Sequence, residues 1–103
     1  MAERENDHIR LAALFRAMGH PTRLRILESI VASEFCVSEL ETDLNCRQAN
    51  ISQHLAILRD RGLVISKRRG RMVCYRLADG RIADVIRQVR DVFHLTGKKE
   101  VAA

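Results

Sequence analysis

The sequence of 103 residues has few aromatic side chains, with three Phe, one Tyr and no Trp. Proteins that read single-stranded RNA usually stack bases on aromatic rings. The composition therefore does not favour an RNA-binding protein, although the charge alone would permit one.

Long apolar runs are also missing, and none approaches the roughly 20 residues that a membrane-spanning helix requires. The first residues, MAERENDHIR, lack the basic and then apolar order of a secretory signal. The three cysteines are an odd number without a close pair. This argues against a disulfide scaffold and predicts a protein of the reducing cytoplasm with no membrane partner.

What the chain does contain predicts one folded domain, because 47% of its residues are hydrophobic and only one is proline. Its charge is divided unevenly. Residues 1–44 carry 5 Arg against 8 acidic residues, whereas residues 45–103 carry 13 basic against 5 acidic residues. A strongly basic half indicates either a face that meets a polyanion or simply a solvated basic surface.

The periodicity predicts a mainly α fold with a small β-hairpin. We expect a helix over about residues 7–19 capped by Asp7, and a second helix that starts at Pro21. A helix-turn-helix follows over about residues 37–61, ended by Gly62. Apolar runs on either side of KRRGR predict a hairpin over about residues 63–78 with its turn at Gly70. A last helix is expected over about residues 81–95.

The stretch NISQHLAILRDRGLV carries the main functional signal. Ile51, Leu55 and Leu58 form one apolar helix face, whereas the opposite face offers short, uncharged polar side chains. Such side chains suit base edges in a DNA major groove, which a helix-turn-helix enters with its second helix. The predicted DNA contacts of this segment are Arg47, Gln48, Asn50, Ser52, Gln53 and His54. For His54, a packed, partly buried position is the equal alternative.

Four basic residues lie within five positions at the expected hairpin tip, namely Lys67, Arg68, Arg69 and Arg71. A basic hairpin after a recognition helix is typical of a wing that contacts the phosphate backbone or the minor groove. The fold class predicted is thus a winged helix-turn-helix spanning residues 1–103. The alternative for the tip is a charged, solvated turn.

The last helix carries more apolar residues than a small core requires, which predicts a partner surface. A homodimer would place two recognition helices about 34–36 Å apart, which suits a palindromic operator. The predicted interface comprises Leu11, Phe15, Ile82, Val85, Ile86, Val89, Val92 and Phe93.

Four segments, LFRAMGHPTRLRILESI, FCVSELETDL, ISQHLAILRDRGLV and RGRMVCYRL, resemble successive parts of the ArsR/SmtB repressors. The resemblance implies a dimer formed by the first and last helices that represses its own operon until an effector binds. Arg47 stands where the family usually has a capping Ser, which costs about 1 kcal/mol and offers a phosphate contact instead.

The resemblance also identifies candidate effector sites. The Cys-Val-Cys of the soft-metal and arsenite sensors corresponds here to Cys36-Val37-Ser38, and Ser is a poor ligand for thiophilic ions. Of a zinc site on the last helix, only Asp79 matches. The cysteine pair of the persulfide sensors, on the second and last helices, is missing. Cys36, with arsenite or a soft metal ion, is the first sensor candidate.

Of the other two cysteines, only Cys74 is a sensor candidate. Cys74 alternates with Val73 and Tyr75, which predicts that it faces away from the core, where a reactive thiol would influence DNA contact. Cys46 is expected to be a buried structural residue, about 10–15 Å from Cys36 across the short helix.

No motif of an enzyme is present, since the sequence lacks a phosphate loop and a base near an evident nucleophile. We therefore predict a DNA-binding repressor that a metal, arsenite or oxidant releases. The alternatives are a winged-helix module for protein–protein assembly and a repressor without any metal or thiol effector.

Overall fold

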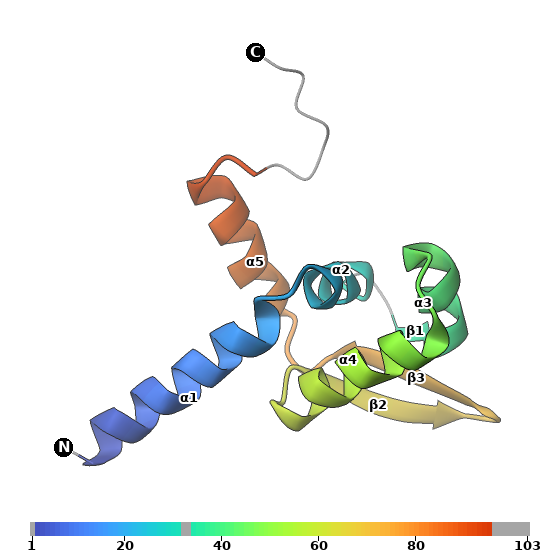
Figure 1. The fold of residues 1–103 in the computed structure, drawn as a ribbon, viewed down its shortest axis with the longest axis horizontal. Helices are drawn as coiled ribbons and strands as arrows, with labels where there is room; N and C mark the ends of the chain where they lie inside the picture. The colour runs from blue at the N-terminus through green and yellow to red at the C-terminus, as the bar shows by residue number, and fades with distance from the viewer. Residues whose placement is uncertain (1, 32–33, 96–103) are drawn as a thin grey trace.

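The computed structural model describes residues 2–31 and 34–95, which form five helices and a three-stranded sheet (Figure 1). Two helices and a hairpin form one end of the molecule, and the first and last helices form the other. In chain order the elements are α1 (Ala2–Met18), α2 (Pro21–Ser29), β1 (Phe35–Cys36), α3 (Val37–Leu44), α4 (Gln48–Asp60), β2 (Val64–Arg69), β3 (Met72–Leu77) and α5 (Arg81–Val92).

The sheet is antiparallel with the order β1-β3-β2, and β2 and β3 form the predicted hairpin. Gly70 forms its turn with a positive φ of 63°, a conformation that residues with a Cβ adopt reluctantly. The winged helix-turn-helix prediction is confirmed. The sequence pattern missed β1, a strand of only two residues that pairs with β3 just before α3 begins.

The core lies where α2, α3 and α4 pack over one face of the sheet. Ile51, Leu55 and Leu58 of α4 are completely buried, as the helical spacing predicted. Tyr75 and Leu77 of β3 close the core from the sheet side. Burial of such side chains contributes roughly 1.5–3 kcal/mol each, so this face fixes how α4 is presented.

Local signals account for most helix ends. Pro21 occupies the first turn of α2 behind His20, whose ring nitrogen accepts a hydrogen bond from the Thr22 amide. The turn between α3 and α4 uses Asn45 in the left-handed conformation, with φ 54°. The Arg47 side chain makes no capping hydrogen bond to α4. This agrees with the lost cap expected there.

Two expectations about element boundaries need correction. Asp7 does not cap the first helix, because α1 already begins at Ala2 and Asp7 lies within it. The last helix ends at Val92 and not near residue 95, since Phe93 and His94 leave the helical conformation.

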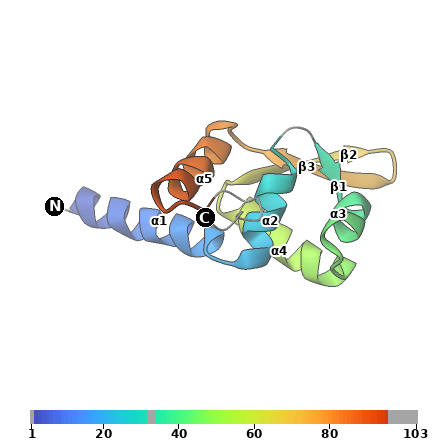
Figure 2. The same ribbon diagram turned by 90° about the horizontal axis from the view of Figure 1, so that it is seen from above.

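Helices α1 and α5 lie at the end of the molecule away from the wing (Figure 2). Both helices expose apolar side chains. Phe15 is 56% exposed and Val92 63% exposed, in contrast to the completely buried apolar face of α4. Ile86 is an exception among the predicted interface residues. It is 9% exposed and packs into the chain's own core, so it is not available to a partner.

Candidate nucleic-acid interface

The outer face of α4 is exposed along its first two turns. Arg47, Gln48, Asn50, Ser52 and Gln53 are all exposed. No acidic residue occupies the first turn of the helix, so nothing there repels a phosphate. Because the buried face is filled by Ile51, Leu55 and Leu58, these polar side chains point away from the body of the protein.

His54 has a different position from its neighbours on α4. Its Nδ1 accepts a hydrogen bond of 3.1 Å from Nε of Arg23, and its ring lies 4.4 Å from that of His20. Partial burial, then the charges of His20 and Arg23, lower the pKa of His54 below its usual value. The structure thus favours the packed alternative, in which His54 attaches α4 to the start of α2.

The wing presents its four basic residues, Lys67, Arg68, Arg69 and Arg71, as exposed side chains around the turn. One of them already has a partner. Arg69 makes a bidentate ion pair with Glu34, with Nε–Oε2 and Nη2–Oε1 distances of 2.7 and 2.9 Å. This hydrogen-bonded pair lowers the pKa of Glu34 and raises that of Arg69. Glu34 was not among the predicted site residues.

The recognition helix and the wing border a common hollow of about 340 Å³. Gln48 and Ser52 line it from α4, Arg71 and Val73 from the wing, and Cys36 from β1. Of the predicted DNA contacts, Gln48 and Ser52 on α4 and Arg71 on the wing therefore lie around the same hollow.

Cys36 and Cys74 form a disulfide bond, which the odd number of cysteines without a close pair did not lead us to expect. The two residues are 38 positions apart in sequence but directly opposite each other in the pairing of β1 with β3. Cys46 is the free cysteine and packs against the core in a partly buried position. Within residues 2–31 and 34–95, no three His, Cys, Asp or Glu side chains are grouped to hold a metal ion.

Cys74 lies on the face of the sheet opposite Tyr75, as the alternation predicted, but only 1% of it is exposed. A freely accessible thiol is therefore not present at this position. Cys36 is partly exposed and is the accessible member of the pair.

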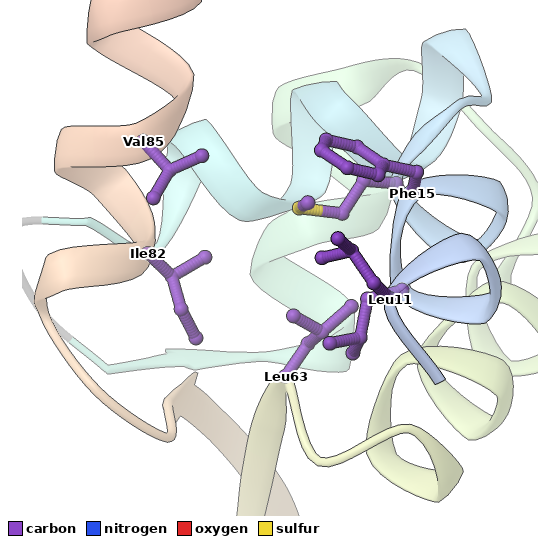
Figure 3. Close-up of a pocket in the computed structure, with 7 residues that line it drawn as sticks. Leu11, Phe15, Leu63, Ile82 and Val85 are labelled. Atoms are coloured by element: carbon purple, nitrogen blue, oxygen red, sulfur yellow. The ribbon is translucent and has the colours of Figure 1, made fainter. Parts of the chain in front are cut away.

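At the other end of the molecule, α1 and α5 enclose an apolar groove of about 210 Å³ (Figure 3). Leu11 and Phe15 project into it from α1, and Ile82 and Val85 from α5, above Leu63. The wall of the groove carries no polar side chain. Such a surface suits another apolar surface and not a nucleic acid.

Comparison with known proteins identifies the family. Residues 20–66 match the family described as "Bacterial regulatory protein, arsR family". The chain is 36% identical to the Biofilm growth-associated repressor of Agrobacterium fabrum over 83 residues, which cover 81% of this chain and 71% of that one. The chain belongs to the ArsR family. From this membership it follows that the chain is a DNA-binding regulator. The members of this family are transcriptional repressors and not enzymes.

Two further relatives support the assignment to the ArsR family. The HTH-type transcriptional repressor SmtB of Mycobacterium tuberculosis is 42% identical over 73 residues, covering 71% of this chain and 54% of that one. The structure of reduced HlyU from Vibrio cholerae N16961 is 31% identical, with a TM-score of 0.78 and coverage of 90% and 98%.

The zinc position of the family is occupied differently in this ArsR-family chain. Asp79 accepts hydrogen bonds from the Arg81 side chain and amide, which lower its pKa to about 2. The carboxylate therefore serves to orient the start of α5.

In the described part of the chain, no helix is long and apolar enough to cross a membrane.

Proposed function

We propose that this protein is a transcriptional repressor that binds a palindromic operator as a homodimer in the cytoplasm. One observation carries the proposal: the exposed polar face of α4 and the basic wing lie side by side around one hollow. Asn50 and Gln53 suit adenine edges in the major groove, and Lys67, Arg68 and Arg71 suit phosphates. The opposite face of α4 is occupied by the core.

The dimer is supported by the apolar end of the molecule. Leu11, Phe15, Val85, Val89, Val92 and Phe93 are each 46% exposed or more in one chain. All six lie on α1 or α5 or just past the end of α5, and they continue the apolar groove. A second copy of the chain, related by a twofold axis, would cover these residues with its own identical surface.

An effector that acts on thiols is the further part of the proposal, with arsenite or a soft metal ion at Cys36 as the candidate. Ser38 supplies no second thiolate, but Cys74 lies opposite Cys36. Reduction of the disulfide would provide two sulfur ligands, which thiophilic ions prefer. This site needs the dithiol form, because sulfurs that are bonded to each other are not thiolate ligands.

The test is fluorescence anisotropy of the reduced protein with a labelled duplex from upstream of its own gene and a scrambled duplex of equal length. We expect tighter binding to the upstream duplex and a steep loss of affinity between 50 and 200 mM salt, on the order of 1,000-fold or more for six or more phosphate contacts. Salt-independent or absent binding would contradict the repressor and favour an assembly module.

The effector is tested in the same assay by adding arsenite or Cd(II). Release that is abolished in Cys36→Ser and retained in Cys46→Ser supports the thiol site. Release that persists in Cys36→Ser contradicts it.

A further inference from the structure

Strand β1 directly precedes the helix-turn-helix. Within the described residues, its only pairing with the wing is the short ladder to β3, and the disulfide lies in this ladder. Residue pairs Phe35–Tyr75 and Cys36–Cys74 make up this contact. Two residue pairs are a weak attachment for an edge strand. The bond between the sulfurs therefore adds a covalent attachment of β1 to β3.

The strand register shows which side chains surround the sulfurs. Cys36, Cys74 and Lys67 lie opposite one another across the three strands and project from the same face, away from Tyr75 and the core. Arg69 follows Lys67 by two residues and projects from this face too. Cys74 is nevertheless almost completely buried, so its neighbours on the flanking strands cover it.

The Glu34–Arg69 ion pair spans the same face. Arg69 is on β2 and Glu34 precedes β1, and these two strands flank β3 on opposite sides, so the ion pair crosses β3. The Glu34 side chain is 22% exposed and the Arg69 side chain 55% exposed. Because Glu34 is two residues before Cys36, a disulfide that fixes Cys36 to β3 also keeps this carboxylate within reach of Arg69.

We infer that Cys36 and Cys74 are a reversible oxidation site for a peroxide, and that the disulfide weakens DNA binding by keeping Glu34 on the wing residue Arg69. The inference rests on the proposed DNA-binding function. In the dithiol form, two residue pairs and the packing of Phe35 against the core retain β1 without a covalent bond, and a DNA phosphate displaces Glu34 from Arg69. In the disulfide form, the carboxylate competes at high local concentration.

The chemistry requires one peroxide per pair. The partly exposed Cys36 thiol first gives up its proton, and the thiolate attacks one peroxide oxygen. An S–O bond forms and the O–O bond breaks, giving a sulfenic acid and a hydroxide, which takes up the proton released from Cys36 and becomes water. The Cys74 sulfur then attacks the Cys36 sulfur, forming the S–S bond while the hydroxyl leaves as water with the Cys74 proton. Two electrons pass from the sulfurs to the peroxide, and a dithiol reductant reverses the reaction.

The first measurement is chemical. The full chain is reduced, treated with hydrogen peroxide, alkylated and digested, and its peptides are analysed by mass spectrometry. We expect a Cys36–Cys74 linked peptide, with Cys46 alkylated and the linkage lost on addition of dithiothreitol. Oxidation that leaves Cys36 and Cys74 unlinked, or that links either of them to Cys46, would overturn the inference.

The second measurement is the anisotropy titration with reduced and oxidised protein. Removing one phosphate contact at 0.15 M salt lowers affinity about 5-fold, so two wings of a dimer give about 25-fold weaker binding and a salt slope shallower by about 1.8. Equal or tighter binding by the oxidised protein overturns the inference. Failure of the reduced protein to bind overturns the proposed function instead.

Variants separate the disulfide from the ion pair. Cys74→Ser and Cys74→Ala should bind DNA like the reduced protein and ignore peroxide, whereas Cys46→Ser should keep the full response. Glu34→Gln should still form the disulfide but show no loss of affinity on oxidation. A Glu34→Gln protein that responds like the wild type would show that the carboxylate plays no part, which contradicts the mechanism.

Discussion

The two ends of this molecule use helices in opposite ways. Helix α4 buries all its large apolar residues but Ile57 and exposes short polar ones, whereas α1 and α5 expose Phe15, Val89 and Val92. The first arrangement suits a hydrated, charged partner such as DNA, and the second suits an apolar surface. One small core therefore supports two different surfaces. The polar or apolar character of the exposed side chains indicates which kind of partner each surface binds.

The largest effect is expected from charges placed on the apolar end. Phe15→Glu combined with Val89→Glu should convert the dimer to a monomer, because two buried carboxylates would have no partners. Operator affinity should then fall on the order of 1,000-fold, since a monomer engages only half of the phosphates and bases that a dimer engages. Sedimentation velocity and anisotropy would measure both changes.

The matched control is Arg87→Glu, on α5 but two residues from Val85 and Val89 and therefore on another side of the helix. This protein should stay dimeric. A double variant that remains dimeric would show that α1 and α5 do not form the interface.

The wing gives the next largest effect. Under reducing conditions, Arg68→Ala with Arg69→Ala should weaken binding to all sequences alike and flatten the salt slope. At 0.15 M salt we expect about 5-fold weaker binding for each phosphate that an arginine no longer neutralises. Arg87→Ala removes an exposed arginine from α5 and should leave the slope as it is. An unchanged slope in the wing variant would remove the wing from the DNA-binding surface.

Gln53→Ala should have a smaller and more selective effect. We expect a loss of about 1–3 kcal/mol at one operator position and relaxed specificity there, because a base contact and not a phosphate contact is removed. Competition with operators mutated at single positions measures this. Gln88→Ala, which removes the same side chain from α5, is the control, and a uniform loss with Gln53→Ala would exclude base reading.

The smallest effect concerns His54, which lies on α4 but contacts the body of the protein. Its pKa is lowered in the folded state, so protonation favours unfolding, and stability present above pH 6.5 should be lost as the pH falls below that value. In His54→Gln this pH dependence of thermal stability should shrink, with less than about a 2-fold change in DNA affinity at pH 8. A larger loss of affinity would show that His54 contacts DNA.

The helices and the hairpin were predictable because their signals are local. The spacing of Ile51, Leu55 and Leu58 fixes the buried face of α4, and Gly70 fixes the turn of the wing. The basic tip and the polar face of α4 follow directly from the sequence for the same reason. The start of α1 was predicted wrongly because Asp is a residue type that often caps helices. Helix α1 in fact begins at Ala2, and Asp7 lies within it.

The features that were missed depend on contacts between distant residues. A strand of two residues has no period to detect, so β1 and the pairing of Cys36 with Cys74 required the sheet register. The ion pair between Glu34 and Arg69 spans 35 positions in the same way. Ile86 belongs to the apolar stripe of α5, but only the packed structure shows that it faces the chain's own core.

The central claim is that α4 reads DNA while α1 and α5 form the dimer. Its most direct test is a hydroxyl-radical footprint of the reduced protein on the duplex upstream of its gene. The account predicts two symmetry-related protected half-sites about one helical turn, or 34–36 Å, apart, both lost in Phe15→Glu/Val89→Glu. One protected half-site, or two that survive this double variant, would contradict a dimer that reads DNA with α4 and assembles through α1 and α5.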